Sequence, residues 1–183
     1  MTETNNAVAA FLVRPGALTD DDCRALIESG SRRPASRAEI VQDAAHRTRR
    51  SASIRWLDGD LDRGVIRRVR DVLRELNEAY FHFDITGIEP LQLARYGIGD
   101  GYGDHIDLGP RDTSRRKLSV TIQLSDPLAY RGGDLVFRGV SPSGARARGT
   151  AIVFPSYLSH EVKPVTSGER YSLAAWAVGP PFR

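Results

Sequence analysis

The sequence predicts an α+β protein in which helices come first and an antiparallel β-sandwich or barrel follows. Apolar residues recur at three- and four-residue spacing between positions 65 and 80, which indicates an amphipathic helix. From about residue 90 onward, short β-rich runs alternate with turn residues at the spacing typical of a sandwich or barrel. The 183 residues, 40% of them hydrophobic, suit one domain with a buried core.

Two helices are expected in the first 88 residues. Thr19 has the chemistry of an N-cap, and the three aspartates that follow it would lie at the positive end of the helix dipole. This helix should end near Ser29, because Gly30 is a typical C-terminal stop. The second helix has one apolar face, formed by Val65, Ile66, Val69, Val72, Leu73, Leu76 and Tyr80.

The remainder of this half is expected to be mostly irregular. Residues 11–15 and 54–57 have the character of short strands. Residues 31–53 are polar, rich in arginine and weakly periodic, so we predict a long loop there. Loops of this length in compact domains are often functional, and an active-site lid is one interpretation.

The second half supplies the β-structure. The breaks between its runs contain glycine and proline, as at Gly99–Gly101, Gly109-Pro110 and Gly132-Gly133. The seven predicted strands are residues 91–96, 105–108, 117–124, 134–138, 150–154, 160–165 and 171–178.

Composition excludes some classes of protein and disfavours others. The net charge is +3, but the 26 basic residues are scattered among 23 acidic ones, so nucleic acid is a disfavoured partner. The chain has no apolar run long enough for a transmembrane helix and no signal-peptide pattern, so we expect no membrane partner and a cytoplasmic location. A lone cysteine, Cys23, allows neither an internal disulfide nor a thiolate metal site.

Three residues have the chemistry of a metal site. His105 and Asp107 are two apart in a predicted strand, where alternate side chains share a face, and His160 begins a later strand. Two histidines and one carboxylate leave coordination positions open, as in non-haem iron(II) oxygenases. The motif H-x-D is short and often occurs by chance, so a purely structural role for these residues stays open.

Arg170 adds a fourth candidate. It follows His160 by ten residues, across a turn predicted at 166–169. That spacing suits a guanidinium that pairs with the far carboxylate of a metal-bound diacid such as 2-oxoglutarate. The alternative is an exposed turn residue paired with Glu169.

Five segments together resemble the prolyl 4-hydroxylase-like (PKHD-type) branch of the 2-oxoglutarate/Fe(II)-dependent dioxygenases. They occur in the order and with the gaps found in that family, and the resemblance covers residues 89–183, whereas residues 1–88 match only in general layout. The segments are Y-G-I-G-D-G-Y-G-D-H-I-D (96–107), R-K-L-S-V-T-I-Q-L-S-D (116–126), Y-R-G-G-D-L (130–135), F-P-S-Y-L-S-H-E-V-K-P-V (154–165) and G-E-R-Y-S-L-A-A-W (168–176).

The resemblance implies a fold and a set of cofactors. The expected core is a double-stranded β-helix (jelly-roll, cupin-like) with the N-terminal helices packed on one sheet. The whole chain would be one dioxygenase domain, with residues 1–88 as helical support and loop, and residues 89–183 as the catalytic core. Fe(II), 2-oxoglutarate and O₂ would be required, and ascorbate is a candidate stimulant.

The resemblance also assigns roles to residues. His105, Asp107 and His160 would be the iron ligands, and Arg170 would bind the distal carboxylate of 2-oxoglutarate. Tyr96 would contact the co-substrate. Gln123 stands where the family often has a tyrosine facing the same carboxylate, so this contact departs from the family pattern. Because halogenases of this class replace the carboxylate ligand with a small residue, Asp107 favours oxygen transfer over halogenation.

Substrate contacts are expected from the loops around the site. Arg111, Arg115 and Arg116 could hold a carboxylate or phosphate of the substrate, with a solvated loop position as the alternative, and Tyr102 could contact the substrate as well. Trp176 is a further candidate, for which a core role is the alternative.

These expectations leave three functions open. The first is hydroxylation of an unactivated C–H bond in a small molecule or an amino-acid or peptidyl substrate, with release of succinate and CO₂. The second is a non-catalytic jelly-roll module that binds a metal or ligand. The third is an oxygenase acting on nucleic acid. Oligomeric state is not indicated by the sequence.

Overall fold

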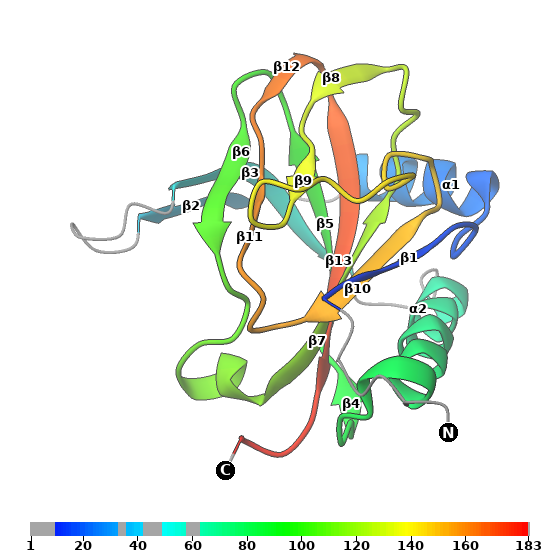
Figure 1. Cartoon of the computed structure of the whole chain (residues 1–183). Helices are drawn as coiled ribbons and strands as arrows, with labels where there is room; N and C mark the ends of the chain where they lie inside the picture. Colours follow the sequence, from blue (N-terminus) through cyan, green and yellow to red (C-terminus); the bar gives the residue numbers. More distant parts are fainter. Residues whose placement is uncertain (1–9, 33–35, 42–48, 58–62, 183) are drawn as a thin grey trace, which may run out of the picture.

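A curled, mostly antiparallel β-sheet runs through the molecule, and helices α1 and α2 lie on one side of it (Figure 1). The computed structural model describes residues 10–32, 36–41, 49–57 and 63–182, with the backbone alone at 36–41 and 49. Within these residues the main sheet has 11 strands in the order β1-β10-β7-β13-β5-β3-β6-β11-β9, with β2 paired to β3 and β4 to β13. Strands β8 and β12 form a second sheet. The predicted α+β class is confirmed.

The strands have the following bounds: β1 (Leu12–Arg14), β2 (Ser36–Val41), β3 (Arg49–Leu57), β4 (Gly87–Ile88), β5 (Leu91–Tyr96), β6 (Gly101–His105), β7 (Arg116–Gln123), β8 (Tyr130–Gly132), β9 (Leu135–Val136), β10 (Ala151–Pro155), β11 (His160–Val162), β12 (Val165–Gly168) and β13 (Arg170–Val178).

Helix α1 (Asp20–Ser31) begins as the sequence predicts and ends later. Thr19 forms a capping box: its hydroxyl accepts the Asp22 N–H at 3.1 Å, and the Asp22 carboxylate accepts the Thr19 N–H at 3.0 Å. The expected stop at Gly30 is wrong, because Gly30 lies inside the helix. A Cβ at this position would lie 2.0 Å from Leu93 Cδ2 on β5, so the glycine permits close packing of α1 on the sheet.

Helix α2 (Arg63–Leu76) follows the predicted periodicity and continues into one π-helical turn, η2 (Asn77–Phe81). The face predicted to be apolar is buried along α2 except for Ile66, which is partly buried, and Tyr80 is 53% exposed. The buried face packs with α1 and with one side of the sheet into a single apolar cluster that includes Leu93, Leu118 and Leu173. Among the helices of the described residues, none has the length and apolar character needed to span a bilayer.

The loop predicted for residues 31–53 is wrong in its described parts, since β2 and β3 pair there in antiparallel register. Residues 42–48 lie outside the described residues, so the lid interpretation stays untested. Strand β3 lies between β5 and β6, and β1 pairs with β10. The first 88 residues therefore supply strands of the main sheet as well as its two α-helices.

Two details of the second half also differ from the prediction. The strand expected at 105–108 instead ends at His105 and begins at Gly101, because the glycine-rich segment is extended between β3 and β11. The turn expected at 166–169 is largely a strand, β12, paired with β8. The other predicted strands lie within a few residues of observed ones, although the run at 160–165 is broken after Val162.

Candidate active site

Three candidate ligands meet where β6 and β11 run side by side. The register of this pair sets His160 opposite His105, and their ring centroids are 4.2 Å apart. Asp107 lies beyond the end of β6, where its own N–H and that of Leu108 both donate to Ser156 O at 2.9 Å. The sequence therefore predicted the meeting of His105 and Asp107 correctly but for the wrong reason: a backbone anchor after the strand, and not strand alternation, positions the carboxylate.

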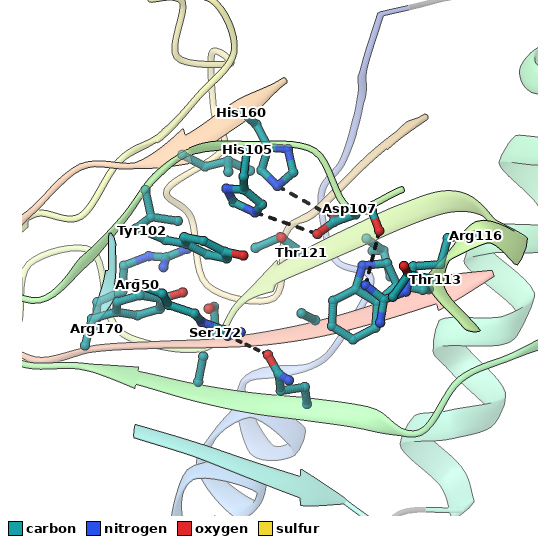
Figure 2. Close-up of a pocket in the computed structure, with 18 of the residues that line it drawn as sticks. Arg50, Tyr102, His105, Asp107, Thr113, Arg116, Thr121, His160, Arg170 and Ser172 are labelled. Carbon is teal, nitrogen blue, oxygen red and sulfur yellow. Dashed lines mark hydrogen bonds and ion pairs between the residues drawn. The ribbon is translucent and has the colours of Figure 1, made fainter. Parts of the chain in front are cut away.

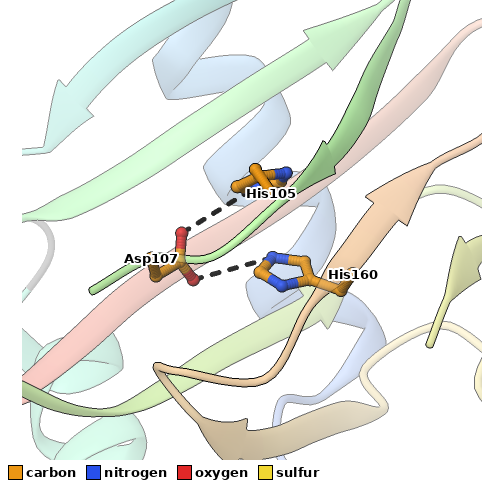
Figure 3. Close-up of side chains that lie close together, drawn as sticks. All are labelled: His105, Asp107 and His160. Carbon is orange, nitrogen blue, oxygen red and sulfur yellow. Dashed lines mark ion pairs between the residues drawn. The ribbon is translucent and has the colours of Figure 1, made fainter. Parts of the chain in front are cut away.

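The geometry of the three side chains is that of an open metal site (Figure 3). Asp107 Oδ1 lies 3.7 Å from His105 Nε2, and Asp107 Oδ2 lies 3.7 Å from His160 Nε2. One ligand atom from each residue lies within 4.8 Å of the others. The Nδ1 atoms contact carbonyl oxygens, Gly103 O at 2.8 Å and Leu158 O at 2.9 Å. Such contacts fix the tautomer that leaves the Nε2 lone pair free for a metal.

The electrostatics of the site favour the metal-binding protonation states. Burial, together with the neighbouring His160, lowers the pKa of His105 from 6.5 to about 4, so its imidazole is neutral at neutral pH. Burial alone would raise the pKa of Asp107, but the two histidines and hydrogen bonds from Ser119 and Trp176 outweigh it and lower the pKa. Two imidazoles and a carboxylate match the donor set of non-haem Fe(II), so these residues fit that ion.

A cavity of about 290 Å³ opens beside these ligands (Figure 2). Its floor is the inner face of β13, from which alternate residues point inward, because side chains on a strand alternate between faces. The residues that line it are Arg50, Trp56, Gln92, Ala94, Tyr96, Tyr102, His105, Asp107, Thr113, Arg116, Val120, Thr121, Leu135, His160, Val162, Arg170, Ser172, Ala174 and Trp176.

Arg170 is a fully buried cation that lines this cavity. The residue is 0% exposed on β13, opposite Tyr96 on β5, and its guanidinium carbon lies 5.2 Å from the Tyr96 ring centroid. Its Nε donates to Gln123 Oε1 at 3.1 Å, which orients the guanidinium. The two terminal nitrogens, Nη1 and Nη2, are buried without a hydrogen-bond partner. Because buried unpaired donors are unfavourable, this arrangement fits a bound carboxylate.

The match to known proteins agrees with this geometry. Residues 91–178 match the family model of the 2OG-Fe(II) oxygenase superfamily. A PKHD-type hydroxylase of Shewanella sp. (strain MR-7) is 36% identical over 128 residues, which cover 64% of this chain and 57% of that protein. Residues 91–178 therefore carry the sequence pattern of the 2OG-Fe(II) oxygenase superfamily. A second relative, a PKHD-type hydroxylase of Maricaulis maris, is 42% identical over 88 residues, which cover 46% of this chain and 39% of that protein.

Solved structures show that the oxygenase fold extends beyond the matched segment. A prolyl-4-hydroxylase of Pseudomonas putida is 25% identical with a TM-score of 0.73, and the match covers 93% of each chain. A viral collagen prolyl hydroxylase from Paramecium bursaria Chlorella virus-1 has a TM-score of 0.71 at 22% identity, covering 94% of this chain and 97% of that one. The predicted jelly-roll core is thereby confirmed. The chain spans roughly two fifths to two thirds of the length of the curated relatives that it matches.

The cavity includes some of the residues expected to contact substrate and leaves out others. Tyr102 lines it and stacks on His105, with ring centroids 3.5 Å apart. Trp176 also lines it, and hydrogen-bonds Asp107. Arg111 and Arg115 are not among its lining residues. Both lie in the short 3-10 helix η3 (Arg111–Arg115), and Arg115 Nε donates to Gly179 O at 3.3 Å.

The two residues expected to contact the co-substrate, Tyr96 and Gln123, differ in their relation to the cavity. Tyr96 lines the cavity beneath Arg170. Gln123 is not a lining residue, and its contact is with Arg170 itself. A glutamine at this position can accept the Arg170 N–H, so the departure from tyrosine keeps a contact that holds the guanidinium in place.

Arg50 is a cavity residue that the sequence interpretation missed. It lies in the segment predicted as a loop, and it is 8% exposed on β3. The missed signal was the alternation of polar residues with Ala52 and Ile54, which together with Arg50 are the residues buried on this part of β3. Arg50 interrupts this alternation in the sequence, because arginine is polar and is rarely found in a core.

Proposed function

We propose that this chain is an Fe(II)- and 2-oxoglutarate-dependent dioxygenase that hydroxylates an unactivated C–H bond, releasing succinate and CO₂. One observation carries the proposal: a His-Asp-His cluster and a buried guanidinium with two unpartnered nitrogens line the same cavity. We also propose that residues 1–183 act as one catalytic domain, because β3 lies between β5 and β6 of the sheet that holds the site.

His105, Asp107 and His160 would hold Fe(II), and Arg170 would pair with the distal carboxylate of 2-oxoglutarate. Bound Fe(II) would activate O₂ as 2-oxoglutarate is oxidatively decarboxylated. The chain itself would position the reacting groups and exclude bulk water from them. Ser119 and Trp176 hold the Asp107 carboxylate by hydrogen bonds, and burial of the ligands keeps bulk water away from the reacting atoms.

Tyr102 supplies a further polar group next to the ligands. Burial raises the pKa of its phenol to about 12, so it stays protonated and can donate a hydrogen bond to an acceptor in the cavity. Tyr96 is proposed to form part of the co-substrate subsite through its place beneath the Arg170 guanidinium.

We propose a small-molecule or peptidyl substrate. A prolyl hydroxylase of Trichoplax adhaerens, with a TM-score of 0.67 to this chain, was solved in complex with a peptide fragment of hypoxia-inducible factor. The half-exposed Trp56 at the cavity lies 6.3 Å from Trp176, centroid to centroid, and offers aromatic surface to such a substrate. A cytoplasmic location stays a prediction.

The experiment is a paired measurement of metal binding and turnover. His105→Ala is expected to weaken Mn(II) binding, measured calorimetrically without oxygen, and to abolish succinate formation from 2-oxoglutarate and Fe(II) in air. The control is His82→Asn, which removes a histidine outside the site and keeps a residue that tolerates its φ of 57°. Unchanged metal affinity in His105→Ala, or wild-type protein that binds neither metal nor 2-oxoglutarate, would contradict the proposed function.

A further inference from the structure

Arg50 is a buried arginine whose hydrogen-bonding capacity is incompletely used. Its Nη2 donates to Gln92 Oε1 at 2.6 Å, and its guanidinium carbon lies 4.9 Å from the Tyr102 ring centroid. Its Nε is buried and has no hydrogen-bond partner. None of the ion pairs found among the described residues involves Arg50, so its charge faces the cavity without a carboxylate.

The Arg50 guanidinium enters the cavity from β3 and lies beside the Tyr102 ring, which stacks on the His105 ring with centroids 3.5 Å apart. Gln92, which accepts the Arg50 Nη2 proton, stands on β5 opposite Ala174 of β13. Along β13, Arg170 comes four residues before Ala174, roughly 13 Å for an extended strand. Trp176, which bonds Asp107, comes two residues after it. The Tyr102 ring therefore connects the Arg50 guanidinium to the proposed metal ligand His105, and all three side chains line the same cavity.

The charges of the proposed complex single out Arg50. A divalent ion and the Asp107 carboxylate leave one positive charge, and Arg170 adds another; the two carboxylates of 2-oxoglutarate neutralise both. Arg116 is already paired, because its Nε and Nη2 donate to the two carboxylate oxygens of Glu89 at 2.8 and 2.7 Å. Among the described residues that line the cavity, Arg50 is then the cation without a counter-charge. An uncompensated buried charge is unfavourable, so a further anion is expected beside it.

We propose that Arg50 binds a carboxylate of the substrate, so that the chain acts on a carboxylic acid, whether a free amino acid or a peptide. This inference rests on the proposed function, because it assumes that 2-oxoglutarate occupies the Arg170 subsite. The free Nε and the Nη atoms of Arg50 are the donors, and Tyr102 and Gln92 hold the guanidinium in place. A planar guanidinium matches a carboxylate through two parallel hydrogen bonds.

The test compares acids with their neutral amides. Protein loaded with Mn(II) and saturated with 2-oxoglutarate is titrated with L-leucine and L-leucinamide, L-proline and L-prolinamide, and N-acetyl-Gly-Leu and its amide. Wild-type protein is expected to bind at least one acid about tenfold or more tightly than its amide, as a charge-assisted pair predicts. The free and the acetylated compounds separate an amino-acid from a peptide substrate.

Arg50→Gln is expected to abolish the acid preference and to change the Kd of 2-oxoglutarate less than about threefold, whereas Arg50→Lys retains part of the preference. Arg95→Gln is the matched control, because Arg95 on β5 pairs with Glu169 outside the cavity. Three results overturn the inference: no acid preference in wild type, a preference that survives in Arg50→Gln, or a loss of 2-oxoglutarate affinity as large as in Arg170→Gln. Failure of wild type to bind 2-oxoglutarate would instead reject the proposed function.

Discussion

Replacing Arg170 with glutamine tests the proposed co-substrate subsite most directly. Two terminal nitrogens of the wild-type side chain lack partners in the protein, so both are free for the distal carboxylate. Each hydrogen bond to a charged group contributes about 1.5–3 kcal/mol. Losing both removes about 3–6 kcal/mol, and at about 1.4 kcal/mol per factor of ten the Kd of 2-oxoglutarate should rise roughly 10²- to 10⁴-fold.

The assay titrates Mn(II)-loaded protein with 2-oxoglutarate and with 2-oxopentanoate, which has the same chain length but no distal carboxylate. Wild-type protein should prefer 2-oxoglutarate by the factor just derived, and Arg170→Gln should bind both ligands with similar, weak affinity. Arg170→Lys should give an intermediate loss, since an ammonium keeps the charge but not the planar fork.

Folding and binding effects can be separated in this series. The described structure gives the Arg170 guanidinium one hydrogen bond, to Gln123, so the free protein should lose little stability in thermal unfolding. If Arg170→Gln bound 2-oxoglutarate as tightly as wild type, or kept the preference over 2-oxopentanoate, the assignment of the distal carboxylate to this residue would be refuted.

Two further predictions concern the helix α1. Gly30→Ala should reduce the free energy of unfolding by about 1–3 kcal/mol in urea denaturation, because the added Cβ would lie 2.0 Å from Leu93 Cδ2 in a closely packed core. The control is Gly64→Ala on α2, which should be neutral or slightly stabilising, because its Cβ would meet no atom closer than 3.9 Å. Equal losses of stability in both variants would contradict the packing explanation. Burial raises the pKa of the Cys23 thiol from 9.0 to about 11, so native protein should react with iodoacetamide at pH 8 far more slowly than urea-unfolded protein. The stability contributed by the protonated thiol is present below about pH 9 and is lost as pH rises toward 11, and rapid labelling of native protein at pH 8 would count against this burial.

Local sequence information predicted the elements whose pattern is strong. The apolar period of α2 and the N-cap of α1 depend on neighbours within one or two turns, so both were predictable. Strand β3 was not, because buried Arg50 interrupts an otherwise alternating pattern. Gly30 led to the wrong helix end, because a glycine is needed there for close packing against Leu93 on β5, and this contact is far away in the sequence.

The same distinction between local and long-range information applies to the site. By itself, the sequence determined the chemical identity of the proposed ligands, His105, Asp107 and His160, and of the proposed anion receptor Arg170, since residue types and spacing carry that chemistry. Tertiary structure alone decided that the Asp107 backbone is anchored by Ser156, that Arg111 and Arg115 stay outside the cavity, and that Arg50 enters it. The physical reason is that sheet pairing and burial join segments far apart in the chain, and no local pattern records which side chains then face one another.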